Sequence, residues 1–430
     1  MKKTALVLGG GGSRGAYEMG VWKALIELDI PVHIVCGTSI GAINGAMIAQ
    51  GSLADAQKMW DTVETSEVFA VPVREDQKLV EKVVKTYSTF AKDLFHGGTD
   101  TSPLKATLER YFDEDKIRKS DVEYGLVTVE KDSLKPWELF IEDIPQGRLV
   151  DFVLASSSIY PAVKPYNIDG IDFIDGTYHD NIPVSMALRK GAEKIIAVDL
   201  GAFGKVKKDV LNSVEDLVYI RSYWDLGITL VFDRSKIKQI ERYGYLDCMK
   251  AFGVFDGYAY TFVKNSLMEI DEEFRKDGTL EKKLGIYSGR SRYSIADQLL
   301  AAKWKKIIND RAARKGSRIS EILISAELAA EILEIDPSKI YTIERLDEKI
   351  QESLSQIEAY PIDRGAKGAK RIKAFLETLA LVDRKQRLKN MAAEIRRIID
   401  NDEELPASRI ASLYTEEFFA ALYVALKGIL

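Results

Sequence analysis

Short apolar runs alternate with longer amphipathic stretches through the first half of the chain. The runs that predict buried strands cover residues 5–8, 34–36, 124–129, 137–141, 173–174 and 194–200. Between the first two runs, Tyr17, Val21, Leu25 and Leu28 recur at helical spacing and form one apolar stripe. A chain in which strands alternate with helices in this way is typical of a layered α/β fold.

The pattern changes in the second half. Beyond about residue 270, glycine and proline become sparse, charged residues become dense, and helical stripes such as residues 319–333 appear. Breaks fall at Asp336-Pro337 and at residues 361–368. We therefore expect three parts, which are a core at residues 3–200, the end of that core with a connection at residues 201–270, and a mainly α-helical C-terminal domain of unknown role at residues 271–430.

Two further segments have distinctive patterns. Residues 52–120 are helical in pattern and rich in charge, and we expect them to form part of a lid over a site in the core. The apolar tail at residues 418–426 is too short to cross a membrane, since a spanning helix needs about 20 apolar residues. It is either a core or dimer contact, or a membrane-surface anchor.

Composition limits the class of protein. Apolar residues make up 46% of the 430 residues, which is enough for a packed core. The formal net charge is −5, so the basic footprint of a nucleic-acid-binding protein is absent and no such partner is expected. Two cysteines, Cys36 and Cys248, make no disulfide framework and fit a reducing compartment. The apolar run at residues 5–8 is too short for a signal peptide.

Candidate chemistry begins at Gly37-Thr38-Ser39-Ile40-Gly41, which follows one predicted strand and precedes a helical pattern. Strand, G-x-S-x-G and helix, in this order, form the context of a nucleophile elbow. The turn is too sharp for bulky neighbours, which explains the glycine on each side of Ser39. The pentapeptide alone is weak evidence, because a glycine turn with a structural serine has the same pattern.

A glycine-rich stretch, GGGGSRG at residues 9–15, follows the first predicted strand. Consecutive glycines can turn several backbone N–H groups into one concavity, which binds a phosphate or the oxyanion of an acyl-transfer intermediate. Gly10, Gly12 and Gly15 also satisfy G-x-G-x-x-G, the pattern of a dinucleotide site. A dinucleotide site needs an acidic residue at the end of the second strand, where this chain has Cys36.

A carboxylate completes the set of candidates. Asp175 ends the predicted strand at residues 173–174, and Gly176 and Thr177 follow it. A carboxylate at a strand end beside a glycine is well placed to face a cleft. An Asp–Gly turn, in which the side chain bonds its own backbone, has the same pattern.

Taken together, these stretches resemble the patatin-like phospholipases, a family of serine acyl hydrolases. The family pattern is G-G-G-x-R-G, then G-x-S-x-G, then D-G-G or D-G-A; this chain has GGGSRG at residues 10–15, GTSIG at 37–41 and DGT at 175–177. LASSSIYP at residues 154–161 resembles the segment A-S-x-A-x-P that precedes the aspartate, and TSPL at 101–104 is a weaker match. The resemblance covers about residues 3–200.

The resemblance implies a three-layer fold with a central, mainly parallel sheet, and a catalytic dyad of Ser39 and Asp175. Partial burial would raise the pKa of that carboxyl group and so make it a better base. The N–H groups of Gly10, Gly11 and Gly12 would form the oxyanion hole.

The remaining site residues follow from the same resemblance. Arg14 would support the glycine loop or contact a lipid phosphate, Gly37 and Gly41 shape the elbow, and Gly176 shapes the turn after the base. Two features depart from the family pattern: Thr177 replaces a small residue, and Ser156-Ser157-Ser158 is more polar than usual.

Histidine offers an alternative base. His179 follows Asp175 by four residues and is the strongest candidate for a Ser–His–Asp triad. His33 precedes the second strand at the end away from the elbow, and His96 lies in a loop pattern, so both are weaker candidates.

We therefore expect a lipid acyl-ester hydrolase of the phospholipase A or lysophospholipase type. A transacylase or thioesterase with the same dyad, and an inactive helical scaffold protein, are the alternatives. The expected partner is a lipid or phospholipid at a membrane surface, in a cytoplasmic protein peripheral to the membrane. No cofactor or metal is expected, because neither C-x-x-C nor H-E-x-x-H occurs.

Overall fold

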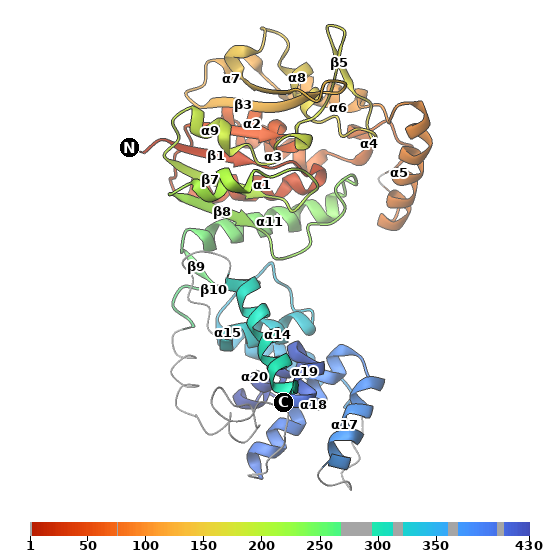
Figure 1. Cartoon of the computed structure of the whole chain (residues 1–430), viewed down its shortest axis with the longest axis vertical. Helices are drawn as coiled ribbons and strands as arrows, with labels where there is room; N and C mark the ends of the chain where they lie inside the picture. Colours follow the sequence, from red (N-terminus) through yellow and green to blue (C-terminus); the bar gives the residue numbers. More distant parts are fainter. Residues whose placement is uncertain (1, 75, 268–294, 313–320, 360–368, 402–407) are drawn as a thin grey trace. The chain divides into compact units, whose positions relative to one another are not determined.

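The chain divides into two compact units, Met1–Phe252 and Gly253–Leu430 (Figure 1). The computed structural model describes residues 2–74, 76–267, 295–312, 321–359, 369–401 and 408–430. Three sequence predictions therefore lie wholly or partly outside the described residues: the start of the stripe at 319–333, the break at 361–368, and residues 271–294 of the expected C-terminal domain.

An eight-stranded sheet forms the centre of the first unit. Its strands are β1 Thr4–Leu8, β2 Ile34–Thr38, β3 Glu123–Glu130, β4 Pro136–Phe140, β5 Tyr166–Ile168, β6 Ile171–Asp175, β7 Lys194–Asp199 and β8 Leu217–Arg221. The order is β5-β6-β3-β2-β1-β7-β8, with β4 paired to β3. The five neighbouring strands β3, β2, β1, β7 and β8 are parallel, whereas β4, β5 and β6 pair antiparallel. The mainly parallel α/β sheet expected from the sequence is confirmed.

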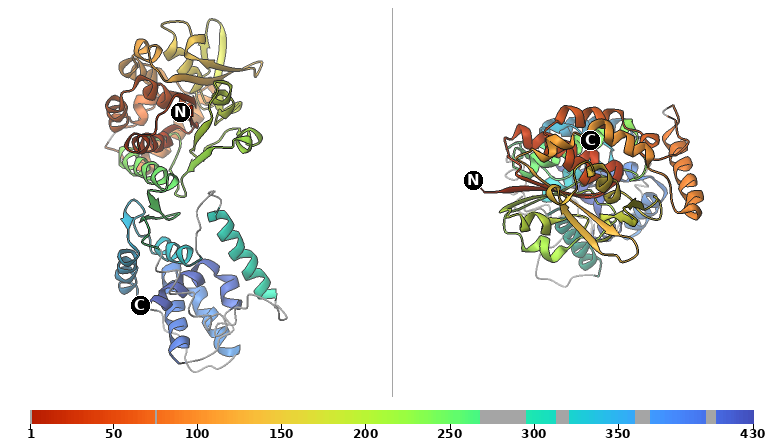
Figure 2. Two further views of the ribbon diagram at one scale, coloured as in Figure 1. Left: turned by 90° about the vertical axis from the view of Figure 1, so that its left-hand side faces the viewer. Right: turned by 90° about the horizontal axis from the view of Figure 1, so that it is seen from above.

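Helices cover both faces of this sheet. They are α1 Ala16–Glu27, α2 Ile40–Gln50, α3 Leu53–Thr62, α4 Thr65–Val68, α5 Leu79–Asp93, α6 Ser102–Tyr111, α7 Glu114–Arg118, α8 Leu149–Ser156, α9 Val184–Arg189, α10 Lys208–Ser213 and α11 Arg234–Ala251. Ala5 and Val7 pack with Ile34 and Cys36 against α9 and α10. Because strand side chains alternate between faces, the intervening residues face α2, α8 and α11, so the unit has three layers (Figure 2).

Strand register brings the candidate residues to one edge of the sheet. Leu8 at the end of β1 lies beside Gly37, so the glycine-rich loop and the elbow leave the sheet together. Thr38 lies beside Val127 of β3, and the next residue of β3, Thr128, lies beside Asp175. Neighbouring strands are about 4.8 Å apart, which places the carboxyl end of β6 close to the elbow.

Two glycines let α11 cross closely over α1, the helix that continues from the glycine-rich loop. A Cβ atom on Gly20 would lie 1.9 Å from the carbonyl oxygen of Glu241, and one on Gly244 would lie 1.9 Å from that of Tyr17. The Tyr17 hydroxyl also donates to Asp247 at 2.6 Å. The first turn of α1 is therefore held by backbone-to-backbone packing against α11.

We expect Gly20→Ala to destabilise the protein, although alanine is the better helix former by about 1 kcal/mol. The added methyl group meets backbone atoms, which cannot move aside cheaply, and overpacking of this kind costs about 1–3 kcal/mol. Urea denaturation of the variant and the parent measures the difference. A variant as stable as the parent, or more stable, would show that the helices do not approach this closely.

The second unit is mainly helical over its described residues, as expected. Its elements are α14 Ile295–Ala312, α15 Glu321–Ile332, α16 Ile343–Ser355, α17 Ala369–Leu381, α18 Arg384–Asp400, α19 Ser408–Leu413, α20 Thr415–Lys427 and a small sheet of β9 Phe255–Asp256, β10 Thr261–Val263 and β11 Ile340–Tyr341. Within α20, Phe418, Tyr423 and Val424 are buried. Of the two roles considered for the apolar tail, burial supports the core contact.

Candidate active site

Ser39 occupies a strained turn between β2 and α2. Its backbone has φ 57° and ψ −123°, a conformation that costs a non-glycine residue about 1–3 kcal/mol. Both flanking glycines are required by close approach, since a Cβ on Gly37 would lie 2.0 Å from the carbonyl oxygen of Gly41, and one on Gly41 would lie 2.5 Å from that of Leu8. The turn holds the half-buried serine at the N-terminus of α2, where an anion is favoured.

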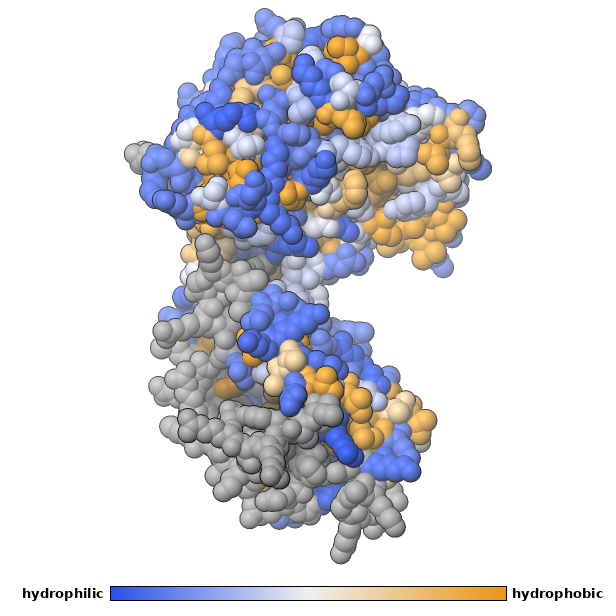
Figure 3. Space-filling model, in the orientation of Figure 1, coloured by the Kyte–Doolittle hydropathy of each residue, from blue (hydrophilic) through white to orange (hydrophobic). Residues whose placement is uncertain are grey.

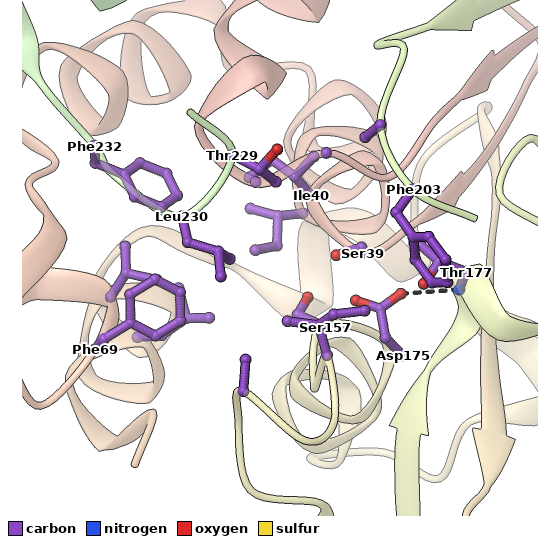
Figure 4. A pocket seen from close by; sticks show the side chains of 18 of the residues that line it. Ser39, Ile40, Phe69, Ser157, Asp175, Thr177, Phe203, Thr229, Leu230 and Phe232 are labelled. Carbon is purple, nitrogen blue, oxygen red and sulfur yellow. Dashed lines mark hydrogen bonds between the residues drawn. The ribbon is translucent and has the colours of Figure 1, made fainter. Parts of the chain in front are cut away.

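Asp175 faces Ser39 from the end of β6 (Figure 4). Its side chain is 1% exposed, and one carboxylate oxygen accepts the Thr177 N–H at 2.9 Å. Burial raises the pKa of Asp175 to about 6, although hydrogen bonds from Thr177 and from the Ser39 side chain oppose this rise. A Cβ on Gly176 would lie 2.3 Å from the carbonyl oxygen of Val127, so only glycine lets the turn sit against β3.

The serine-rich segment at the end of α8, residues 156–158, contacts the backbone of both Ser39 and Asp175. Ser156 accepts the backbone N–H of Ser39 on its hydroxyl oxygen at 3.0 Å, and the carbonyl oxygen of Ser158 accepts the N–H of Asp175 at 2.9 Å. Ser157 lines the cavity beside them. The polar residues that the sequence marked as a departure therefore connect the elbow to the end of β6.

The glycine-rich loop approaches Ser39 but does not offer all its N–H groups to the cavity. The N–H of Gly10 donates to the side-chain oxygen of Asn181 at 2.9 Å, whereas no acceptor is found among the described residues for the N–H groups of Gly11 and Gly12. Both of these line the cavity. Gly12 has φ 55°, and a Cβ there would lie 2.2 Å from the carbonyl oxygen of Thr229, so no larger residue fits.

Arg14 is directed at backbone carbonyl groups. Its guanidinium donates to Gly227 at 2.8 Å and 3.0 Å, to Gly201 at 2.9 Å and to Leu200 at 3.2 Å. These contacts tie the glycine-rich loop to two other segments of the same unit, at residues 200–201 and 227. Arg14 is not among the residues that line the cavity.

A buried polar network lies behind the loop. Asn44 of α2 donates to the carbonyl oxygen of Gly15 at 3.0 Å and to Glu18 at 2.7 Å, and it accepts from the Trp60 indole at 2.9 Å. Burial raises the pKa of Glu18 well above its usual range. Sequence reasoning missed this network, although a polar Asn44 inside an apolar helical pattern was an available signal. Asn181 was also missed, and no pattern in the sequence pointed to it.

The structure does not bring a histidine to Ser39. The Nε2 atom of His179 faces Glu138 at 3.2 Å and Lys207 at 2.9 Å, and burial together with Lys207 lowers its pKa. The Nδ1 atom of His33 accepts the Thr4 N–H at 3.1 Å, and His96 is exposed. None of the three histidines lines the cavity.

The cavity at this site has a polar end and an apolar body. Its volume is about 400 Å³. Ser39, Asp175, Gly11 and Gly12 lie at the polar end, and apolar side chains from helices α2 to α6 and from the segments after α4 and before α11 form most of the rest (Figure 4). They include Ile40, Ile43, Met59, Trp60, Val63, Val68, Phe69, Leu104, Leu230 and Phe232. Part of the segment at residues 52–120, expected as a lid, thus forms the cavity wall.

Over the described residues, no helix is long and apolar enough to cross a membrane. Within the same residues, no group of three or more His, Cys, Asp or Glu side chains is arranged to hold a metal ion.

The strained serine between a parallel strand and a helix places this unit among the α/β proteins with a nucleophile elbow. Residues 6–188 match the family model described as patatin-like phospholipase. This match confirms, for this part of the chain, the resemblance to that family that the sequence predicted.

Curated relatives are similar to the same part of the chain. Lysophospholipase nte1 of Aspergillus terreus is 31% identical over 206 residues, which are 47% of this chain and 12% of the relative. Patatin-like phospholipase domain-containing protein 6 of Homo sapiens is 32% identical over 205 residues, which are 46% of this chain and 13% of the relative. The protein of the same name from Pongo abelii is 26% identical over 364 residues, which are 78% of this chain and 24% of the relative. The chain thus spans less than a quarter of the length of each.

Solved structures give weaker likenesses. VipD from Legionella pneumophila has a TM-score of 0.38 and 13% identity, covering 100% of this chain and 91% of that one. The type III effector protein ExoU has a TM-score of 0.24 and 15% identity, covering 99% and 78%. Both scores are below 0.5, so neither superposition supports an argument about this chain.

Burial of Asp175 predicts a pH-dependent effect on stability. Because the native pKa is about 6 and that of an unfolded aspartate is about 3.9, the native state binds more protons between these values. Stability therefore falls as the pH rises through this window. We expect Asp175→Asn, which removes the buried charge, to melt at a higher temperature than the parent above about pH 6 and to lose this advantage near pH 4.

Thermal denaturation between pH 4 and pH 8 measures the difference. Asp172→Asn is the matched control, because Asp172 lies on the same strand but is only half-buried. Equal melting temperatures for Asp175→Asn and the parent at every pH would contradict the burial of a charged Asp175.

Proposed function

We propose that this protein hydrolyses acyl esters of lipids, with Ser39 as the nucleophile and Asp175 as the base. The observation that carries the proposal is the meeting of a strained serine with a buried carboxyl group at the polar end of an apolar cavity. A serine hydroxyl is a poor nucleophile until a base takes its proton. A carboxyl group with a pKa near 6 is ionised at neutral pH and is a better base than a solvated aspartate.

The proposed reaction proceeds in two stages. Asp175 accepts the Ser39 hydroxyl proton while Oγ attacks the ester carbonyl carbon, and the carbonyl oxygen becomes an oxyanion. When the intermediate collapses, the proton passes to the leaving alcohol and the acyl group stays on Ser39. Water then attacks the acyl group, again giving a proton to Asp175, and the acid is released as Ser39 regains its proton.

We propose Gly11 and Gly12, rather than all three glycines, as the backbone donors to the oxyanion. Both residues line the cavity, and their N–H groups have no acceptor among the described residues, whereas the Gly10 N–H donates to Asn181. A donor at an oxyanion is worth about 3–4 kcal/mol in mutant tests. Arg14 is proposed to support this loop rather than to contact a phosphate, because its guanidinium already donates four hydrogen bonds to three backbone carbonyl oxygens.

A lipid acyl chain is the proposed substrate group. The cavity of about 400 Å³ is walled by aliphatic and aromatic side chains, and burial of apolar surface stabilises a bound chain by about 25 cal/mol per Å². The names of the relatives, lysophospholipase and patatin-like phospholipase, support a phospholipid or lysophospholipid. Transfer of the acyl group to an alcohol instead of water uses the same residues, and product analysis with and without an acceptor alcohol separates the two reactions.

We expect Ser39→Ala to lower kcat for a short-chain ester by at least about 1000-fold and to abolish labelling by a fluorophosphonate. Asp175→Asn should lower kcat by nearly as much, because the nucleophile and its base act as a unit. His179→Ala is the matched control and should cost less than about tenfold. A large loss in His179→Ala with substantial activity in Asp175→Asn would assign the base to His179 instead.

The same base predicts the pH profile. Asp175 must be ionised to accept the proton. The logarithm of kcat/KM should therefore rise with pH with a slope of one below pH 6 and level off above it, with an apparent pKa of about 6. Asp180 is a second buried carboxyl group whose pKa burial raises to about 6, so Asp180→Asn is the necessary control. The break in the profile should persist in that variant, and its disappearance would assign the titration to Asp180.

A further inference from the structure

Helix α5 and the 3₁₀ turn after it, η2 Leu94–His96, present an apolar stripe to solvent. Val80 is 73% exposed, Val84 61%, Tyr87 46% and Phe95 88%. The spacing of four, three and eight residues places these side chains along one side of the helix. Figure 3 shows hydrophobic side chains gathered where α5 lies in Figure 1. Exposed apolar stripes of this kind mark interaction sites rather than ordinary surface.

The other side of α5 is fixed to the first unit. Phe90 is buried and meets Phe69 edge-on, with ring centroids 5.2 Å apart. Thr86 is also buried, and Lys82 forms a buried ion pair with Asp233 at 3.8 Å. Because one side of the helix is packed, the opposite apolar stripe remains in solvent as a fixed feature of the surface.

The stripe continues into the proposed substrate cavity. Tyr87 belongs to the stripe and also lines the cavity. Phe69, the buried partner of Phe90, lines the same cavity. An apolar molecule that leaves the cavity past Tyr87 would thus meet the α5 stripe. The stripe is therefore adjacent to the place where a lipid chain would enter.

A row of lysines runs beside the stripe. Lys78, Lys85 and Lys92 are exposed and are spaced by seven residues, which brings side chains of a helix back to nearly the same line. None of them forms an ion pair with a described residue. Glu81 lies on the same side, so the row keeps a net positive charge. Lysines beside an apolar stripe extend their ammonium groups to anionic head groups while the stripe enters the lipid.

We propose that α5 and η2 dock on an anionic lipid surface and that the acyl chain enters the cavity past Tyr87. This inference rests on the proposed hydrolysis of lipid esters. The apolar stripe would sit among the first carbons of the acyl chains, and the lysine row would contact phosphate groups. Docking of this kind requires no spanning helix.

Vesicle binding without turnover tests the docking. Phosphatidylcholine vesicles with and without about 30% phosphatidylserine are sedimented with the full-length Ser39→Ala protein, in which hydrolysis cannot change the surface. Adding Val84→Glu and Phe95→Glu should lower binding to the anionic vesicles by at least about tenfold. Reversing Lys78, Lys85 and Lys92 to glutamate should remove the preference for anionic vesicles.

Ile26→Glu is the matched control, because Ile26 is 50% exposed on α1 and is not a cavity residue. It should bind vesicles as the parent does. Hydrolysis of a dispersed short-chain ester, measured with Ser39 restored, should be unchanged by all of these substitutions. Failure of the parent to hydrolyse that ester would overturn the proposed function, whereas unchanged vesicle binding by Val84→Glu/Phe95→Glu would overturn the docking alone.

Size-exclusion chromatography separates the other occupants of the stripe. If the parent is a dimer and Val84→Glu/Phe95→Glu is a monomer while vesicle binding is unchanged, the stripe is a contact between copies of this chain and the lipid proposal is wrong. The parent and the variant are expected to elute alike.

Discussion

The burial of the Asp175 carboxyl group is the constraint on which the rest of the site depends. Removal from water raises its pKa to about 6, and the Thr177 N–H and the Ser39 side chain compensate only in part. Each of these partners is in place because of another close contact. Gly176 lets the turn sit against β3, and Gly37 with Gly41 lets Ser39 reach across the end of the sheet. Burial destabilises the carboxylate form, and the same effect makes a carboxyl group at such a site a stronger base at neutral pH.

Support for the glycine-rich loop comes from parts of the chain that are distant in sequence. Asn181 holds Gly10 by a hydrogen bond at 2.9 Å, Arg14 joins the loop to segments about 190 and 210 residues away, and the glycine crossing of α1 and α11 fixes the helix that follows. These contacts restrict the motion of a loop in which glycines would otherwise leave the backbone flexible. Preorganised donors are the condition for strong oxyanion stabilisation, and these contacts would supply that condition for the proposed donors Gly11 and Gly12.

The apolar part of the cavity reaches the exposed surface of α5 at Tyr87. The helices between residues 53 and 111 supply much of the cavity wall, and α5 among them also carries the exposed stripe. One segment therefore serves the proposed binding of an acyl chain and the proposed docking on lipid. Hydrophobic burial favours both events through the same non-directional term, so the segment can be apolar on two sides without specific polar contacts.

Sequence alone determined the parts of this protein that depend on local pattern. The strand runs, the elbow at Ser39, the glycine-rich loop and the strand end at Asp175 are all short-range signals, because steric demands at a turn or a strand select residue types within a few positions. Only the tertiary structure decided the contacts that depend on distance through space. It turned His179 toward Glu138 and Lys207, gave the Gly10 N–H to Asn181, and placed α5 with one packed and one exposed side. A hydrogen bond or a packing contact between residues far apart in the chain leaves no periodic trace in either segment, because the partner is chosen by strand order and register rather than by neighbours in sequence.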